Sequence, residues 1–206
     1  MDECYKSNLE MATTLKSLGF TMNFTPVADL IFQDSSNVIG DRSFGSDPDV
    51  VIAFCKQVIR AHNDAGICPV IKHAPGHGRA KLDSHFELPI VDASKEELDA
   101  TDFKVFRELV TFSKQHGYKV YGMNAHIIFT ALDSEHCATF SEEVIKFIKE
   151  EIGIDYLVTD AIEMNTLSGS YGDRAILSLG AGADAVLFCK PDLTDMIEIA
   201  NVLGVI

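Results

Sequence analysis

Residues 68–85, CPVIKHAPGHGRAKLDSH, join a short apolar run to a loop that is dense in polar groups. The run Cys68–Ile71 predicts a buried strand, and Pro75, Gly76 and Gly78 predict a loop directly after it. Loops at strand ends carry chemistry because a rigid scaffold positions them while their side chains stay free. This stretch therefore predicts a site for a small ligand on an α/β scaffold.

The titratable side chains of this loop allow three interpretations. They form a solvated surface, a metal site or a proton-transfer site, drawn from Lys72, His73, His77, Asp83 and His85. Two histidines separated by three residues bind zinc well on a helix, but Pro75 and Gly76 disfavour a helix here. The metal interpretation is therefore the weaker of the two functional ones.

Asp83 and His85 are the candidates for proton transfer. Because one residue separates them, both side chains point the same way if the segment is extended. A carboxylate beside an imidazole orients the ring and favours its charged form, which suits a general acid or base near neutral pH.

Helical and strand patterns alternate along the whole chain, which predicts parallel strands joined by crossover helices. The expected strands are 20–27, 69–73, 119–124, 156–159 and 185–188. The expected helices are 2–18, 48–65, 94–115, 141–151, one ending at 178, and 193–202, with a capping box at Ser94 and Glu97. A closed (β/α)8 barrel has eight strands. The fold class is therefore α/β, an incomplete (β/α)8 TIM-type barrel with about five parallel strands.

Asp160 directly follows the expected strand 156–159. An acid at that place lies on the catalytic rim of an α/β barrel. Taken alone, Asp160 fits equally well as the N-cap of the segment that follows.

The composition indicates a cytoplasmic enzyme. A net charge of −14 over 206 residues disfavours binding to nucleic acid or to anionic membranes. No segment is apolar over the length of a membrane span, and the first residues lack the apolar core of a signal peptide. Five scattered cysteines fit reduced thiols and not a disulfide framework.

Five motifs, spread over nearly the whole chain, together resemble one known family. They are Phe24–Asp29 (FTPVAD), Asp41–Pro48 (DRSFGSDP), the KHAPGHGRAKLDSH loop, Asn124–His126 (NAH) and Thr159–Met164 (TDAIEM). In this order they resemble the family 3 glycoside hydrolases, in particular the bacterial β-N-acetylglucosaminidases (β-N-acetylhexosaminidases) of peptidoglycan recycling.

The resemblance implies a retaining glycosidase that acts on terminal β-linked N-acetylhexosamine. Asp160 is implied as the nucleophile that forms a covalent glycosyl-enzyme, and His85 as the acid/base with Asp83 as its partner. The sugar is implied to be held by Arg42, Lys72 and His73. No cofactor and no metal are implied, and the partner is a small carbohydrate that contains N-acetylglucosamine. Retaining glycosidases usually pair two carboxylates, and a His–Asp pair supplies the proton without a second bare anion.

The chain departs from the family pattern in two ways. Ala74 stands where the family loop has Phe, and the upstream Asp-x-Glu-Gly-Gly segment has no match here. Residues 1–206 are therefore expected to form the family's N-terminal-type catalytic domain without its first strands. An unpaired sheet edge then predicts oligomerisation or a missing N-terminal segment.

Several alternatives stay open from the sequence. The chain is a glycosidase, or a catalytically inactive remnant or sugar-binding module of the same fold. Water and phosphate are both possible acceptors, and the exact sugar is not fixed by a derived pocket.

The remaining polar residues have weaker assignments. Arg42 is either a ligand of a sugar or carboxylate or a loop cation paired with Asp41 or Asp47. Asp29 caps a turn or braces the site, and His126 faces a ligand or is a hydrogen-bonded core residue. The residues expected at the surface, because they have no companions, are His62, His116 and His136.

Overall fold

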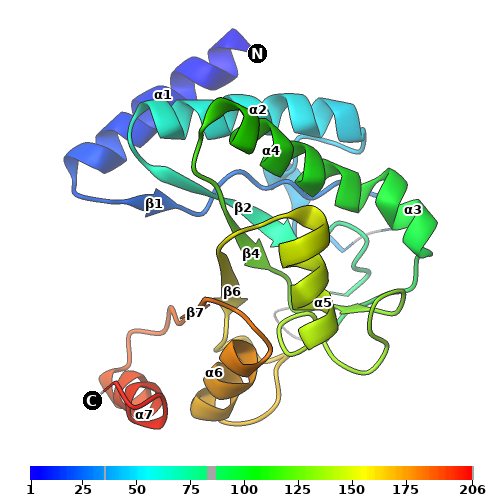
Figure 1. Cartoon of the computed structure of the whole chain (residues 1–206), viewed down its shortest axis with the longest axis vertical. Helices are drawn as coiled ribbons and strands as arrows, with labels where there is room; N and C mark the ends of the chain where they lie inside the picture. Colours follow the sequence, from blue (N-terminus) through cyan, green and yellow to red (C-terminus); the bar gives the residue numbers. More distant parts are fainter. Residues whose placement is uncertain (35, 83–86, 206) are drawn as a thin grey trace.

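A computed structural model describes residues 1–34, 36–82 and 87–205, and within them five parallel strands form one sheet. The strand order is β1-β2-β4-β6-β7, which follows the chain (Figure 1). The strands are β1 (Met22–Asn23), β2 (Cys68–Ala74), β4 (Tyr121–Asn124), β6 (Leu157–Ala161) and β7 (Ala185–Leu187). The predicted incomplete TIM-type barrel with five parallel strands is confirmed.

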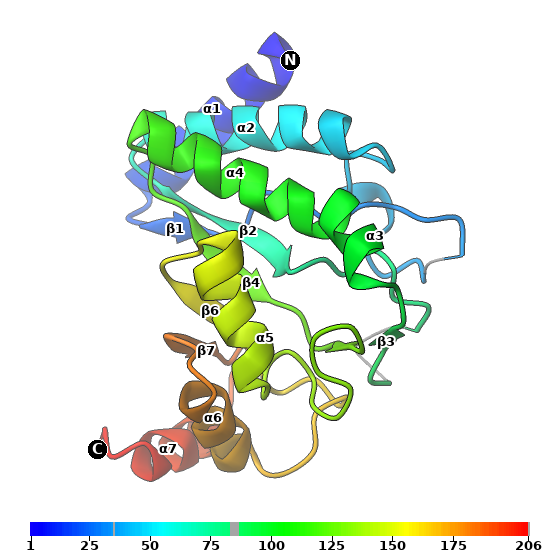
Figure 2. The ribbon, with the colours of Figure 1, turned by 45° about the vertical axis from the view of Figure 1, so that its right-hand side comes forward.

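Helices connect these strands and cover one face of the sheet (Figures 1 and 2). They are α1 (Asp2–Ser17), α2 (Pro48–Asp64), α3 (Lys95–Ala100), α4 (Asp102–His116), α5 (Glu142–Lys146), α6 (Tyr171–Gly180) and α7 (Leu193–Val202). Two short turns of other geometry are the 3-10 helix η1 (Gly40–Arg42) and the π-helix η2 (Phe147–Ile152). The two chain ends lie at opposite ends of the molecule.

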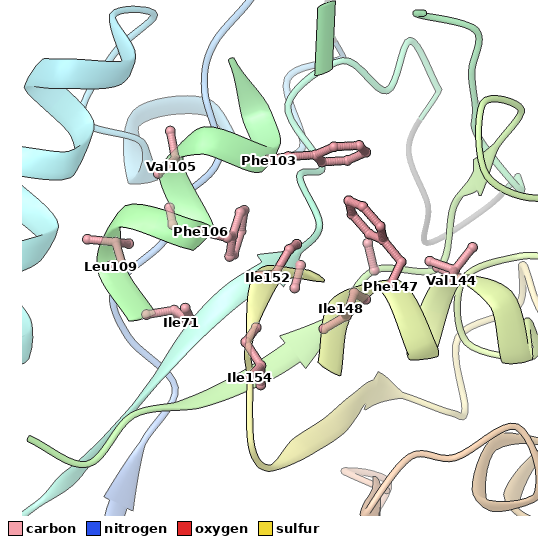
Figure 3. Packing of buried hydrophobic residues seen from close by; sticks show 14 of the residues in the cluster. Ile71, Phe103, Val105, Phe106, Leu109, Val144, Phe147, Ile148, Ile152 and Ile154 are labelled. Atoms are coloured by element: carbon pink, nitrogen blue, oxygen red, sulfur yellow. The ribbon is translucent and has the colours of Figure 1, made fainter. Parts of the chain in front are cut away.

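The main hydrophobic core lies between the sheet and the helices α2, α4, α5 and η2, and Figure 3 shows the part at α4, α5 and η2. Ile71 of β2 packs there with Phe106 and Leu109 of α4, all fully buried. Because side chains alternate along a strand, the residues on either side of Ile71 face the opposite, inner surface of the sheet. Val70 indeed belongs to a separate inner cluster with Met123 and Val158.

Several helix starts follow from local capping. Asp47 accepts the N–H of Asp49 at 2.8 Å, and Pro48 occupies the first turn of α2. Of the predicted capping box, the Ser94 half is present, because its hydroxyl accepts the N–H of Glu97 at 3.2 Å, whereas the Glu97 carboxylate accepts from Arg79.

Some predicted elements are shorter or divided. Strand 20–27 is reduced to β1 because Pro26 has no N–H to donate, and its pairing with β2 resumes only at Val27. Helix 94–115 is divided at Thr101, where the guanidinium of Arg79 donates to the Thr101 hydroxyl. The sequence also gave no sign of the two-residue strands β3 (Ile90–Val91) and β5 (Ile128–Phe129), which pair with each other.

His62 is not at the surface, as its isolation in the sequence suggested. It lies on the buried face of α2, with Nδ1 2.8 Å from the carbonyl of Val58 and Nε2 3.0 Å from the amide of Asn23. The helical spacing of Val51, Cys55, Val58 and His62 could have revealed this. His116 and His136 are exposed, as predicted.

All five cysteines are unpaired thiols. None of the helices within the described ranges is both long and apolar enough to cross a membrane.

Candidate active site

The carboxyl ends of β2 and β6 bring Lys72 and Asp160 to the same surface. Lys72 lies two positions after Val70, and Asp160 lies two positions after Val158. Because both valines belong to the inner cluster and side chains alternate along a strand, Lys72 and Asp160 share the inner face of the sheet. The sequence predicted that Asp160 directly follows this strand, but the structure places it within β6. In a parallel sheet this end is where ligands bind.

Asp160 is held as an anion. Its Oδ1 accepts the N–H of Ala161 at 2.8 Å, and its side chain is 20 % exposed. Burial alone would raise the pKa of Asp160, but the electrostatic influence of His73, His126 and Lys72, together with that hydrogen bond, lowers it below the usual value. A partly exposed carboxylate of this kind can act as a nucleophile.

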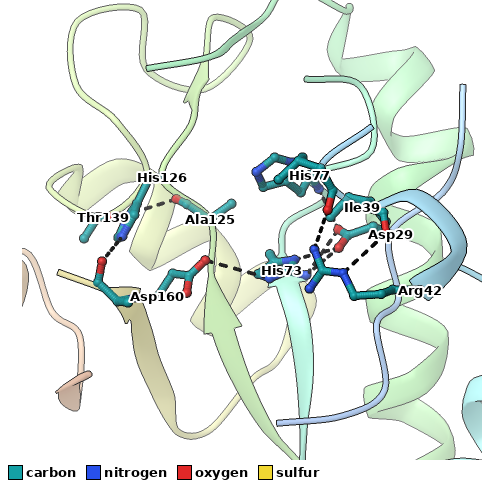
Figure 4. A network of polar contacts seen from close by, with 11 residues as sticks. Asp29, Ile39, Arg42, His73, His77, Ala125, His126, Thr139 and Asp160 are labelled. Atoms are coloured by element: carbon teal, nitrogen blue, oxygen red, sulfur yellow. Dashed lines mark hydrogen bonds and ion pairs between the residues drawn. The ribbon is translucent and has the colours of Figure 1, made fainter. Parts of the chain in front are cut away.

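His73 lies between two carboxylates (Figure 4). Its Nδ1 is 2.7 Å from Oδ2 of Asp29, and its Nε2 is 3.8 Å from Oδ2 of Asp160. The ring is nearly buried, and the peptide bond between Lys72 and His73 is cis.

Asp29 organises the start of the loop. Its fully buried carboxylate accepts the backbone N–H of His73 at 3.1 Å and that of His77 at 2.7 Å, in addition to the contact with the His73 ring. Burial tends to raise the pKa of Asp29, but His73 and His77 outweigh it and the pKa is lowered.

The glycines of the loop are required by close approach. A Cβ on Gly78 would lie 1.8 Å from the carbonyl oxygen of Leu30, and one on Gly76 would lie 2.7 Å from Cβ of Asp102. Gly76 also has a φ of +143°, which side chains other than glycine rarely adopt. The loop therefore packs directly on the segment that carries Asp29.

Arg79 fixes the far side of this loop. Its guanidinium donates to Asp102 at 2.7 Å and to Glu97 at 2.6 Å, and it lies 4.1 Å from the ring centre of Phe32. Asp102 is fully buried, and burial raises its pKa in spite of Arg79.

Lys72 and His77 also interact electrostatically with Asp160. Burial lowers the pKa of Lys72, an effect that Asp160 opposes, and Arg42 lies near enough to lower it further. Burial also lowers the pKa of His77 to about 4, and its ring packs edge-on against that of His73 with 5.5 Å between centres.

His126 is a hydrogen-bonded core residue that supports the strand of the candidate nucleophile. Its Nε2 lies 3.0 Å from the carbonyl oxygen of Ala161, and its Nδ1 lies 2.6 Å from Oγ1 of Thr139. Because a carbonyl can only accept, Nε2 donates to Ala161, and burial lowers the pKa of His126.

Arg42 takes neither of the partners that the sequence suggested. Its Nη2 donates to the carbonyl of Val38 at 2.6 Å and its Nε to that of Ile39 at 3.3 Å. Figure 4 shows these two contacts, and the guanidinium is close enough to Lys72 to influence its pKa.

The structure therefore brings together Asp160, Lys72 and His73, with Arg42 beside them. Asp83 and His85 lie outside the described residues. The sequence gave no decisive role to Asp29, which the structure places at the centre of the network. An available signal was that Asp29, like Asp160, follows an apolar run near a strand end.

Within the described ranges, no three His, Cys, Asp or Glu side chains are grouped so that they could hold a metal ion. The arrangement offers instead an anionic carboxylate surrounded by polar groups that can donate to a hydroxyl-rich ligand.

Comparison with known proteins shows that the chain is similar to the members of one family. The family model described as the glycosyl hydrolase family 3 N terminal domain matches residues 1–206. A beta-hexosaminidase of Tolumonas auensis is 39 % identical over 184 residues, which cover 87 % of this chain and 53 % of that protein.

Solved structures of the same family are also similar to this chain. A glycoside hydrolase family 3 beta-N-acetylglucosaminidase from Paenibacillus sp. superposes with a TM-score of 0.89 and 33 % identity, covering 97 % of this chain and 38 % of that one. NagZ from Neisseria gonorrhoeae, in complex with N-trifluoroacetyl-D-glucosamine, gives a TM-score of 0.80 and 32 % identity, covering 95 % and 56 %. The chain spans about half the length of the curated relatives it matches.

Proposed function

The chain belongs to glycosyl hydrolase family 3, and from that premise we propose that it hydrolyses terminal non-reducing β-linked N-acetylhexosamine with retention of configuration. The whole of residues 1–206 acts as part of one catalytic domain. The substrate is a fragment of the cell wall that contains N-acetylglucosamine, and the reaction belongs to cytoplasmic recycling of such fragments.

The observation that carries the proposal is the setting of Asp160. Its carboxylate is partly exposed at the carboxyl end of β6, with its pKa lowered by His73, His126 and Lys72 against the effect of burial. A nucleophile that must be ionised at neutral pH requires such surroundings.

In the proposed reaction, Oδ2 of Asp160 attacks the anomeric carbon and the bond to the leaving oxygen breaks. His85, partnered by Asp83, gives that oxygen its proton and then removes a proton from the water that releases the sugar. Arg42, Lys72 and His73 hold the hydroxyls of the sugar.

The test is release of nitrophenol from its β-N-acetylglucosaminide by the full chain. We expect turnover by the wild type and its loss in Asp160→Asn. Asp155→Asn is the matched control, because Asp155 precedes the same strand and its side chain is 79 % exposed. The control should leave turnover unchanged.

The variant His85→Ala distinguishes formation of the covalent glycosyl-enzyme from its hydrolysis. Nitrophenol leaves without help from an acid, so the first step should proceed, whereas release of the sugar lacks its base. We expect a burst of about one nitrophenol per chain, a covalent sugar adduct in the mass spectrum, and faster turnover when azide is added. A folded wild type without turnover would contradict the proposal and favour a sugar-binding module.

A further inference from the structure

Asp29 is fully buried beside the candidate site, yet none of the proposed catalytic steps uses it. It contacts His73 through the ring and through the backbone N–H. We propose that Asp29 is a positioning residue that holds His73 as the Nδ1–H tautomer, so that Nε2 faces Asp160 and the bound sugar. The catalytic consequence of this inference rests on the proposed function.

The tautomer follows from the donors and acceptors around Asp29. An ionised carboxylate can only accept hydrogen bonds, and Oδ2 of Asp29 lies 2.7 Å from Nδ1 of His73. Nδ1 must therefore carry the proton that this contact requires. The other ring nitrogen, Nε2, then carries a lone pair that can accept from a sugar hydroxyl, while Oδ2 of Asp160 lies 3.8 Å away, beyond hydrogen-bond distance.

The carboxylate also fixes where the ring is. Its oxygens accept the N–H of His73 and that of His77, which anchors both ends of the turn that carries the ring. The lowered pKa of Asp29, due to His73 and His77 and opposed by burial, keeps it ionised and therefore acceptor-only at neutral pH.

An asparagine at this position cannot reproduce these contacts. If its NH2 group faces the N–H of His77, two donors oppose each other. If the NH2 group faces Nδ1 of His73, the ring must accept there and move its proton to Nε2. In the second arrangement the NH2 group also lies 3.1 Å from the backbone nitrogen of His73, but that N–H keeps its acceptor at the other oxygen, likewise 3.1 Å away. Asp29→Asn is therefore expected to switch the neutral ring to the Nε2–H tautomer.

That switch changes what the ring offers at the site. With Nδ1–H, the neutral ring presents a lone pair at Nε2, which can accept from a sugar hydroxyl. With Nε2–H, it presents a donor toward Asp160, which stabilises the carboxylate before attack and weakens it as a nucleophile.

The experiment observes the tautomer directly. Long-range 1H–15N spectra of the 15N-labelled full chain at about pH 8.5, where imidazoles are neutral, distinguish protonated from unprotonated ring nitrogens. The His73 signals are those lost in His73→Gln. We expect protonation at Nδ1 in the wild type and at Nε2 in Asp29→Asn, with kcat on the nitrophenyl substrate about 10²-fold lower in the variant.

Asp133→Asn is the matched control. Asp133 accepts the N–H groups of Glu135 and His136 and lies 3.1 Å from Nδ1 of His136, so it makes similar contacts with a histidine whose side chain is 60 % exposed. This variant should lose similar hydrogen bonds but leave the His73 spectrum and kcat unchanged.

The outcomes separate the two proposals. Protonation at Nε2 in the wild type would overturn the inference, and this reading does not depend on whether Asp29→Asn folds. A switched tautomer with unchanged kcat would overturn its catalytic part. If the wild type releases no nitrophenol, the proposed function fails, while the spectra still decide whether Asp29 sets the tautomer.

Discussion

Nε2 of His73 lies 3.8 Å from Oδ2 of Asp160, although the two residues are 87 positions apart in the chain (160 − 73). Strands β2 and β6 do not pair with each other, because β4 lies between them. The contact therefore spans the inner face of the sheet and links the loop to the candidate nucleophile.

This contact predicts a change in pH dependence. Burial raises the pKa of Asp160, and among the opposing influences that of His73 is the largest. His73→Gln should therefore raise the pKa of Asp160. Since the nucleophile must be ionised, the acid limb of kcat/KM should move to higher pH. The other charged groups that face this pair, and that remain in the variant, are Asp29, Lys72, His77 and His126.

The measurement is kcat/KM on the nitrophenyl substrate as a function of pH. His136→Gln is the control, since it removes an exposed histidine that is paired with Asp133. An acid limb that stays in place in His73→Gln would show that His73 does not set the ionisation of Asp160.

Asp29 predicts an acid-sensitive contribution to stability. Its folded-state pKa is lowered by His73 and His77 against burial, so its contribution is present above the ordinary value of 3.8 and is lost as the pH falls through the folded value. Asp29→Asn should cost about 2 kcal/mol in the free energy of unfolding at pH 7, and less in acid. Urea unfolding between about pH 7 and pH 3 measures this. A cost that is independent of pH would contradict the prediction.

Gly78→Ala should destabilise the protein by on the order of 3 kcal/mol, since the new Cβ would meet the carbonyl oxygen of Leu30 at 1.8 Å. Gly180→Ala is the control. It lies at the end of α6 with no atom within 4 Å of the added Cβ, and it should stabilise by about 0.5 kcal/mol. The measurement is the melting temperature of both variants. Equal shifts of the two melting temperatures from the wild type would show that the close approach of Gly78 to Leu30 is absent.

Arg79→Met should cost about 3–5 kcal/mol, because it leaves the buried Asp102 carboxylate without its cation. Lys95→Met removes an exposed ion pair with Asp99 and should cost at most about 0.5 kcal/mol. Chemical denaturation measures both. If Arg79→Met unfolds no more easily than Lys95→Met, then Asp102 does not depend on Arg79.

The sequence could predict the elements whose signals are local. Helix α7 has the predicted bounds 193–202, and α2 begins at Pro48 as its capping pattern indicates. The count of five strands was correct for the main sheet of the described residues for the same reason, since most of its strands are short apolar runs between breaks. The two-residue strands β3 and β5 carry no such signal, because their pairing is non-local and each is too short to show alternation.

The residues of the candidate site were likewise only partly predictable from local signals in the sequence. The sequence by itself determined the residue types and their order: Lys72 and His73 after one strand and Asp160 at the end of another. Only the tertiary structure decided that Asp29 holds His73, that Arg42 donates to the backbone of its own loop, and that His62 is buried. The physical reason is that periodicity and capping act between near neighbours in the chain. The partner of a buried carboxylate or imidazole is instead set by the register of parallel strands, which crossover helices separate by many residues.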